Sequence, residues 1–301
     1  MIIVLAVCVL VGIGVVAFWP GEREPEYNGK KLSDWLREYN NQWPPWAPGA
    51  ISQEAVDAVR HIGTNALPFL VKWIRDDKDV PKWKTKLYDI AYTCNSRFAR
   101  TKALEIIAQR QLLAYRATWG FEILGQSAGA AIPELTQVAR DGNAESAFGA
   151  LTALSYVGKE SIPSLLALAN DRNFKSRIQA IGALGGMRRL GADAHPIVVC
   201  LIEHLKEPDP KIVCATANVL GRLNLESEIS VPALAGLLQS TDAGVRERGL
   251  ANLRDFGDRA RPILPQLLAA LRDSNADVRR GATNALQIIA PEVLTNGVKN
   301  L

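Results

Sequence analysis

A short motif recurs along this chain of 301 residues at nearly constant spacing, and it limits the folds that the chain can adopt. The motif is an apolar residue, a proline, a variable residue and a leucine, and it occurs at Leu67–Leu70, Ile132–Leu135, Ile162–Leu165, Val231–Leu234 and Leu264–Leu267, with a weaker copy at His195–Val198. From Pro133 onward, successive prolines are 30, 33, 36 and 33 residues apart. A fixed period of this length is typical of architectures that stack one small unit.

Each unit is predicted to hold two helices. Proline is favoured in the first turn of a helix, so the motif marks the start of the first helix, and Ser161 is placed to cap one of them. In the last unit a polar turn follows at Asp273–Asn275, and apolar residues then recur at helical spacing through Ala276–Ala290. Glycine closes several units, at Gly158, Gly191 and Gly257. One helix pair cannot bury its apolar face alone, so we predict an all-α fold, an α-solenoid of about six stacked helix pairs.

The N-terminal segment has a different character. Ile2–Phe18 are 17 uncharged, mostly apolar residues, which is the lower limit for a membrane-spanning helix of roughly 17–25 residues. Trp19 lies where an interfacial aromatic residue is expected, and Pro20 ends the helix. We therefore predict that residues 1–19 form a single-pass transmembrane anchor or a signal helix. Whether this segment is cleaved stays open.

The rest of the chain is predicted to divide into two parts. Residues 20–50 are expected to form a linker, roughly Pro20–Gly29, and an N-terminal cap whose helix begins near Leu32. Residues 51–301 are expected to form the solenoid. An insertion at about residues 78–109 separates the two helices of the first unit, because the prolines on either side of it are 65 residues apart, close to two periods.

The turns carry a resemblance to a known family. An aspartate is followed six residues later by an arginine in Asp171–Arg177 and Asp273–Arg279. Together with the helix pairs, this pattern resembles the HEAT repeat, in the HEAT-like form also found in bilin-lyase relatives, over about residues 51–290. Some units depart from the pattern: Ser240 stands in place of the aspartate before Arg246, and Val213 and Ala147 stand in place of the arginine. The regular stacking that the resemblance implies is therefore expected only in part.

The segment before the solenoid shows a more specific resemblance than the repeats do. EPEYNGKKLSDWL, at residues 24–36, resembles the cap of exported bacterial HEAT-repeat proteins, in which a membrane or signal segment precedes it. This resemblance implies that the repeat domain lies in the periplasm or outside the cell. Arg23, Lys30 and Lys31 point the other way, because positive residues beside a membrane span favour the cytoplasm. That group has no defined activity, so the resemblance brings no catalytic residues with it.

Charge and motif content argue against several classes of function. From Gly125 to the end the chain holds 19 Lys and Arg residues against 18 Asp and Glu residues, so it lacks the basic field of a nucleic-acid-binding protein. The four cysteines form no paired spacing and the three histidines no metal-binding or catalytic motif. We expect free thiols, no metal site, no cofactor, no nucleic-acid partner and no enzymatic activity.

The concave surface of the solenoid is the predicted binding site, because stacked repeats present their second helices there for extended ligands. Candidate residues at equivalent places in successive units are Arg177, Arg246 and Arg279, then Asn218 and Asn284, then Arg254 and Gln287. They form a polar track for a peptide, or the three arginines bond to turn carboxylates and loop carbonyls between units. We favour the structural role for those three arginines, and a ligand-binding role for Arg254, Asn284 and Gln287.

The insertion and the cap are further candidates. Between Lys72 and Arg116 there are 11 Lys and Arg residues against 5 Asp and Glu residues, with aromatic residues among them. A membrane surface or an acidic partner would suit the patch Lys82, Trp83, Lys84 and Lys86. The alternative is a lid whose lysines are solvated. Trp43 and Trp46 either plug the open end of the solenoid or form an exposed polyproline-type segment.

These observations predict a membrane-tethered or exported scaffold that binds a protein or peptide on its concave surface. The alternatives are a lyase-like enzyme or enzyme subunit of the HEAT-like family, and a protein that organises a membrane surface through the basic insertion. The identity of the partner and the oligomeric state stay open.

Overall fold

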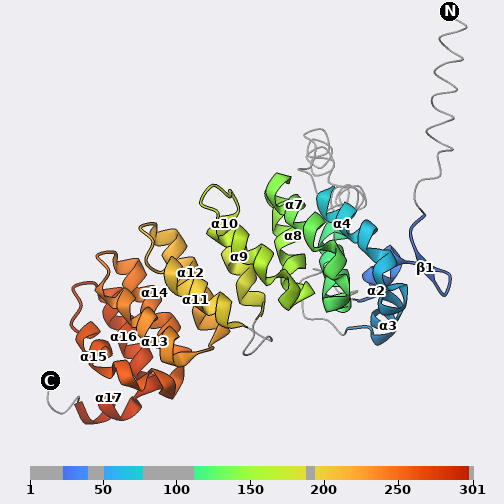
Figure 1. Cartoon of the computed structure of the whole chain (residues 1–301). Coiled ribbons are helices and arrows are strands. Elements are labelled where there is room, and N and C mark those ends of the chain that lie inside the picture. The colour runs from blue at the N-terminus through green and yellow to red at the C-terminus, as the bar shows by residue number, and fades with distance from the viewer. Residues whose placement is uncertain (1–22, 40–50, 77–111, 188–193, 298–301) are drawn as a thin grey trace, which may run out of the picture.

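The chain forms a curved stack of helices in the computed structural model, which describes residues 23–39, 51–76, 112–187 and 194–297 (Figure 1). Four predicted features lie outside the described residues: the apolar segment Ile2–Phe18, the pair Trp43 and Trp46, the insertion with Lys82, Trp83, Lys84 and Lys86, and the closing glycine Gly191. In the described part of the chain, no helix combines the length and the apolar character needed to cross a membrane.

Within these ranges the solenoid contains six helix pairs, as the repeat predicts. The first helices are α4 (Leu67–Arg75), α7 (Ile132–Asp141), α9 (Ile162–Asn170), α11 (His195–His204), α13 (Ser227–Gly236) and α15 (Leu264–Ala270). The second helices are residues 112–124, α8 (Ala144–Val157), α10 (Arg177–Leu184), α12 (Pro210–Leu223), α14 (Ala243–Arg254) and α16 (Ala276–Ile289). A last helix, α17 (Pro291–Gly297), follows them.

Five of the six first helices begin at the residue before the proline of the motif. The exception is α13, which begins at Ser227 and holds Pro232 in its interior. Here the chain turns at Glu226, whose φ is 47°, and the backbone N–H of Ser230 donates to the carbonyl of Glu226 at 2.9 Å. The helix is therefore nucleated four residues ahead of the position that the motif predicts.

The turn before α9 differs from the prediction that Ser161 caps the helix. The buried hydroxyl of Ser161 donates to the carbonyls of Leu154 and Gly158, both at 2.7 Å, and accepts no bond from the start of α9. Gly158 has a φ of 103°, in the region that only glycine adopts without strain. The hydroxyl of Ser161 thus links the turn at Gly158 to the last residues of α8.

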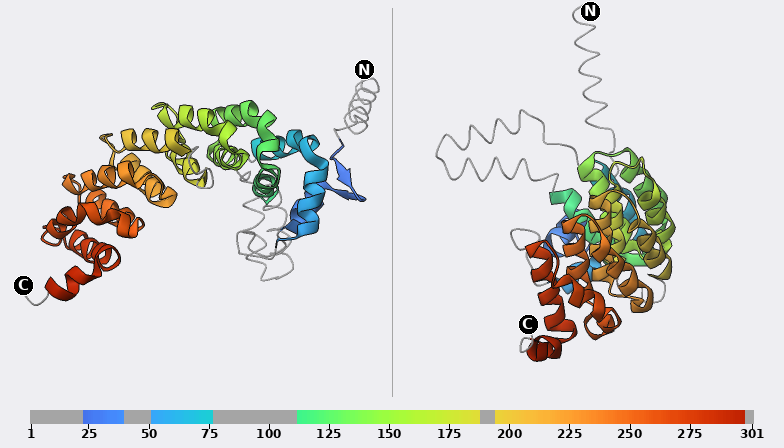
Figure 2. Two further views of the ribbon diagram at one scale, coloured as in Figure 1. Left: turned by 60° about the horizontal axis from the view of Figure 1, so that its bottom comes forward. Right: turned by 90° about the vertical axis from the view of Figure 1, so that its left-hand side faces the viewer.

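The second helices line the inside of the curve (Figure 2). They pack on one another more closely than the first helices do, and the inner side of a curved stack is the shorter one. Small residues permit this approach: a Cβ atom added to Gly221 of α12 would lie 2.3 Å from the Oδ1 atom of Asn252 on α14. The prediction that the second helices form the concave surface agrees with this packing.

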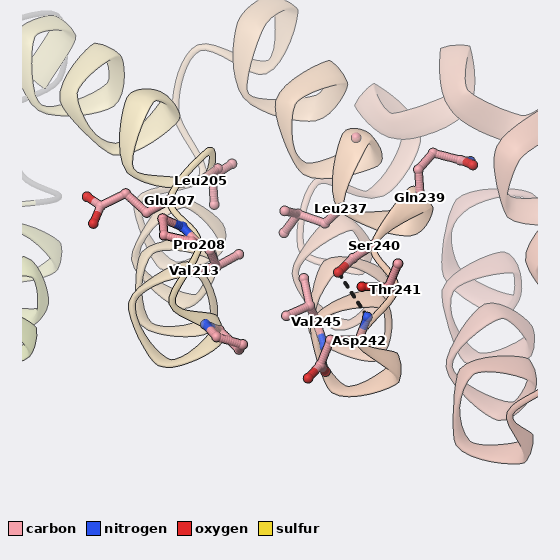
Figure 3. A pocket seen from close by; sticks show the side chains of 12 residues that line it. Leu205, Glu207, Pro208, Val213, Leu237, Gln239, Ser240, Thr241, Asp242 and Val245 are labelled. Atoms are coloured by element: carbon pink, nitrogen blue, oxygen red, sulfur yellow. Dashed lines mark hydrogen bonds between the residues drawn. The ribbon is translucent and has the colours of Figure 1, made fainter.

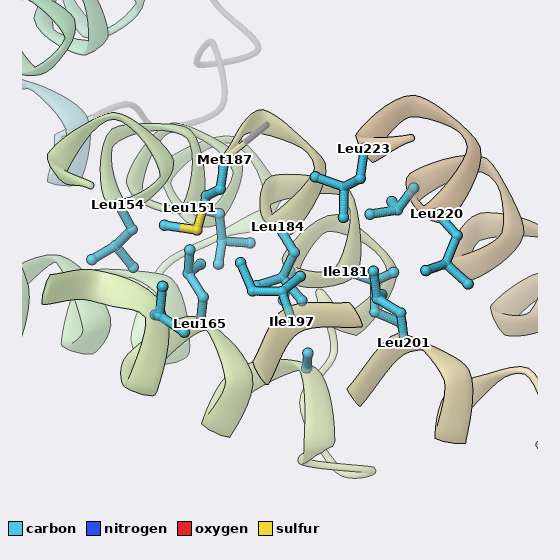
Figure 4. Packing of buried hydrophobic residues seen from close by; sticks show 14 of the residues in the cluster. Leu151, Leu154, Leu165, Ile181, Leu184, Met187, Ile197, Leu201, Leu220 and Leu223 are labelled. Carbon is cyan, nitrogen blue, oxygen red and sulfur yellow. The ribbon is translucent and has the colours of Figure 1, made fainter. Parts of the chain in front are cut away.

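A continuous apolar core runs between the two layers of helices. Figure 4 shows its middle, where side chains of α8, α9, α10, α11 and α12 interdigitate. The fully buried leucines and isoleucines there include Leu151, Leu165, Ile181, Leu184, Ile197, Leu201 and Leu220. Each unit therefore covers the apolar face of the next, as the repeat requires.

The N-terminal cap begins with a β-hairpin that the predicted linker did not include. Strands β1 (Glu26–Tyr27) and β2 (Lys30–Lys31) pair antiparallel, so the chain is not entirely α-helical. Asn28 and Gly29 have φ angles of 50° and 74°, which both central residues of a type I′ turn require. The Asn-Gly pair thus makes the hairpin, and α2 (Leu32–Tyr39) begins at the predicted position beside α3 (Gln53–Ile62).

Trp35 of α2 holds this cap together. Its side chain is 1% exposed, and its indole N–H donates to the carbonyl of Tyr27 at 3.1 Å. The ammonium of Lys30 lies 4.3 Å from the centre of the Trp35 ring and pairs with Glu38 at 2.9 Å. The ring of Tyr27 lies 4.2 Å from that of His61 on α3. The residues of the cap motif therefore have structural roles at the end of the stack.

Candidate binding surfaces

Arginines connect neighbouring units at the turns between first and second helices. Arg177, at the start of α10, is buried and donates to the carbonyl of Ala169 at 2.6 Å. Its two terminal nitrogens donate to the carboxylate of Glu207 in the next unit, at 2.8 and 2.5 Å. These bonds hold the pKa of Glu207 below its usual range, because the guanidinium stabilises the charged form.

The other two arginines of this set make similar bonds. Arg246 donates to both carboxylate oxygens of Asp273 at 2.8 Å and also to the carbonyls of Ser240 and Thr241. Arg279, in the last pair, donates to the carbonyls of its own turn, those of Asp273 and Ser274. All three therefore make the turn contacts that we favoured over ligand binding.

Asp171 does not pair with Arg177, the arginine that follows it by six residues in the sequence. Its carboxylate accepts from Arg140 of the preceding unit at 2.8 Å, while Arg177 reaches forward to Glu207. At the first described interface, Arg75 pairs with Glu134 in the same direction. In each of these ion pairs, the arginine of one unit thus bonds to a carboxylate of the following unit.

A cleft of about 320 Å³ lies where this series of ion pairs is interrupted, between the turn that precedes α12 and the turn that precedes α14. Val213 stands at the place of Arg177 and Arg246, and Ser240 at the place of the turn aspartate. Figure 3 shows the facing walls. The cleft is lined by Leu205, Glu207, Pro208, Pro210, Val213, Gly236, Leu237, Gln239, Ser240, Thr241, Asp242 and Val245. The two departures from the repeat pattern were visible in the sequence, but the cleft was not predicted.

Three exposed apolar side chains form a row on neighbouring second helices. Tyr115, Phe148 and Ile178 are 37%, 59% and 40% exposed and occupy equivalent positions, 33 and 30 residues apart. Tyr115 lies ten residues before Gly125 and Phe148 ten residues before Gly158, and both glycines follow the end of their second helix with a positive φ. We call these residues the apolar row. It was not predicted, although aligning second helices on the closing glycine would have found its first two members.

The predicted polar residues lie farther along the inner surface. Arg254 on α14 and Gln287 on α16 are exposed and hold the same place in successive units, with Asn284 exposed beside Gln287 on the same helix. Asn218 is half-buried and accepts a hydrogen bond from the Nδ2 atom of Asn252 at 3.2 Å. Asn218 thus joins α12 to α14, while the other three remain accessible.

A cysteine and a histidine meet at the junction of α9 and α11. The Nε2 atom of His204 lies 2.8 Å from the Oδ1 atom of Asn170 and 3.5 Å from the thiol of Cys200. Burial raises the pKa of Cys200 and lowers that of His204. The pair is therefore a neutral thiol beside a neutral imidazole, unlike the low-pKa thiolate of a catalytic cysteine. Cys200 and Cys214 are both free thiols.

The burial of His204 predicts a pH dependence of stability. In the unfolded chain its pKa takes the ordinary value of 6.5, and in the folded chain it is lower. As the pH falls below 6.5, the unfolded chain takes up the proton first, so the free energy of unfolding should decrease until the pH passes the folded pKa. Denaturant titrations between about pH 7 and pH 5 should show a smaller decrease for His204→Gln, whose amide keeps a donor near Asn170. An unchanged decrease would contradict this assignment.

No cluster of three or more His, Cys, Asp or Glu side chains within the described ranges is arranged to hold a metal ion. The candidate surfaces are therefore the inner surface, with its apolar row and polar residues, and the cleft at the interrupted ion pairs.

Comparison with known protein families agrees with the helix pairs. Residues 162–254 match the family model for HEAT repeats, and residues 263–293 match that for a single HEAT repeat. The chain contains HEAT repeats. The matched segments hold α9 to α16. They therefore include Arg177, Arg246, Arg279 and the cleft between α12 and α14.

Several solved structures match the chain. The complex of CpcE and CpcF of phycocyanin lyase from Nostoc sp. PCC7120 is 25% identical over 52% of this chain and 98% of that chain, with a TM-score of 0.43. An engineered protein is 19% identical over 75% and 97% of the two chains, with a TM-score of 0.41. The karyopherin Kap121p, bound to the extreme C-terminus of the protein phosphatase Cdc14p, is 14% identical over 89% of this chain and 31% of that chain, with a TM-score of 0.50. No curated protein matches the chain.

Proposed function

We propose that this HEAT-repeat protein is a scaffold that binds a protein or peptide partner along its inner surface. The apolar row carries the proposal, because three large apolar side chains are exposed at equivalent places on adjoining second helices, the helices that line the inside of the curve. Exposed apolar residues that lie together on a folded protein mark interaction sites. Arg254, Asn284 and Gln287 continue the surface with polar groups that can bond to a peptide backbone.

The apolar segment Ile2–Phe18 supports a second part of the proposal. We propose that it tethers the solenoid to a membrane or directs its export, with the repeats facing the periplasm or the cell exterior. Protease added to intact cells or spheroplasts should then degrade the repeats. Protection until the membrane is lysed would place them in the cytoplasm.

The scaffold proposal is tested by site-specific crosslinking in cells. A photo-reactive residue at Arg254 or Gln287 should capture a small, reproducible set of identified proteins. The same probe at Val199 of α11 or Leu268 of α15, which are exposed on first helices, should not capture them.

Substitutions in the apolar row give the matched test. Phe148→Ser with Ile178→Ser should reduce capture from Gln287 by about tenfold or more, as expected for apolar anchors of an interface. Val199→Ser, an exposed apolar residue on the outside, should leave it unchanged. Equal capture from both faces, or capture that is insensitive to the apolar row, would refute the scaffold on this surface.

A further inference from the structure

The group that is missing from the cleft can be inferred from the ion pairs at the neighbouring interfaces. Consecutive units are joined by Arg75–Glu134, Arg140–Asp171, Arg177–Glu207 and Arg246–Asp273, and the last three of these ion pairs lie at the turns between first and second helices. Between the pairs α11–α12 and α13–α14, no lysine or arginine lines the cleft. Each of the other interfaces between consecutive units from α4 to α16 thus has an arginine–carboxylate ion pair. Among the described residues this interface has none: Arg248 of α14 interacts with the thiol of Cys214 on α12 instead, and the space between the two turns is open.

The backbone at the cleft resembles the sites that hold guanidinium groups elsewhere in the chain. Arg246 and Arg279 each donate to the carbonyls of the residues six and five positions earlier. The equivalent carbonyls before Val213 belong to Glu207 and Pro208, and both residues line the cleft. A valine cannot donate to them, so a guanidinium from outside the chain would find acceptors in the same arrangement.

The walls and the charge of the cleft also suit an arginine side chain. Val213 and Leu205 face Leu237 and Val245 across the gap, which gives an apolar lining for the methylene groups of the side chain (Figure 3). The charged residues in the lining are both acidic: Glu207, which is engaged by Arg177, and Asp242. Asp242 accepts from the backbone N–H of Val245 through Oδ1, and a carboxylate retains further acceptor sites.

We propose that this cleft binds the arginine side chain of an extended segment of a partner protein, which completes the series of inter-unit ion pairs. The guanidinium donates to the carbonyls of Glu207 and Pro208 and to the carboxylate of Asp242. The methylene groups pack between Val213 and Val245. This site lies at the turns, apart from the inner surface, so it does not depend on the proposed role of the apolar row.

Small probes of graded chemistry test the site directly. Ethylguanidinium, ethylammonium and the uncharged ethylurea are titrated into the full-length protein, with labelled valine and leucine methyl groups observed by NMR. Ethylguanidinium should shift the methyl signals of Val213 and Val245 saturably, and about tenfold more tightly than ethylammonium, because only the planar fork meets several acceptors at once. Ethylurea should have no saturable effect. Equal responses to all three probes, or shifts scattered over the protein, would overturn the proposal.

Substitutions at the cleft supply the controls. Val213→Arg places the chain's own guanidinium in the space, so it should abolish binding and raise the melting temperature. Val199→Arg adds the same charge at an exposed site on α11 and should leave binding intact. Asp242→Asn preserves the helix cap, since asparagine caps as well as aspartate, and should weaken binding about fivefold or more through loss of the charge. Binding that survives Val213→Arg in a folded protein would overturn the proposal.

Peptide selection tests the extension to a partner segment. Displayed peptides that bind the wild type, with those that also bind Val213→Arg removed, should carry an arginine at one fixed position. Absence of arginine from the selected peptides would overturn the proposal. Retention of these peptides by the Phe148→Ser and Ile178→Ser variant is expected, which separates this site from the inner surface.

Discussion

Replacing Arg177 with alanine should lower the free energy of unfolding by about 3 kcal/mol, because removal of one partner from a largely buried ion pair leaves the other charge uncompensated. The side chains of Arg177 and Glu207 are only 11% and 14% exposed. The substitution also removes the hydrogen bond that Arg177 donates to the carbonyl of Ala169. Denaturant unfolding at neutral pH, followed by circular dichroism, measures the loss.

Two controls separate the ion pair from a general effect of losing an arginine. Arg279→Ala removes hydrogen bonds to exposed turn carbonyls without leaving a buried charge, so it should cost no more than about 1 kcal/mol. Arg177→Met combined with Glu207→Leu removes both charges and should recover most of the stability, because apolar residues can replace a buried ion pair without loss. Equal losses for Arg177→Ala and Arg279→Ala would show that the inter-unit ion pair is not what stabilises this interface.

The repeat allowed most of the fold to be predicted, because proline has a local preference that does not depend on distant contacts. Pro133, Pro163 and Pro265 each lie in the first turn of a helix, as expected. Pro232 lies inside a helix, because the turn at Glu226 starts that helix early. The hairpin at the cap was missed even though its Asn-Gly pair is a known turn signal, since two-residue strands have almost no hydrophobic pattern of their own.

The candidate sites were less predictable, because they depend on how one unit meets the next. Arg177 is six residues from Asp171 in sequence, yet it bonds to Glu207 in the following unit. Val213 and Ser240 were recognised as departures from the pattern. Whether they leave a cleft also depends on the distance between the flanking helices, which the sequence does not specify. The exposure of Phe148 likewise depends on the curvature of the stack, which no local pattern specifies.

Replacing Trp35 with alanine should remove about 3–5 kcal/mol of local stability, the usual loss for a large buried aromatic residue. The effect should be confined to the N-terminal end, because each unit of a solenoid contacts only its neighbours and unfolding can begin at one end. Hydrogen exchange should therefore become much faster in α2 and α3, while the amides of α14 and α16 keep their protection.

Trp35→Phe is the matched control, because it keeps an aromatic ring in the core but loses the indole N–H that donates to Tyr27. It should reduce the local stability less than the alanine substitution does. The difference between the two losses of stability measures how much the aromatic ring contributes to the cap. Since the terminal unit of a stack has a neighbour on one side only, a cap must cover its apolar face for the rest of the solenoid to remain soluble. If Trp35→Ala instead accelerated exchange equally in α3 and α16, the chain would unfold as one cooperative unit, and the cap would stabilise every helix pair rather than the first.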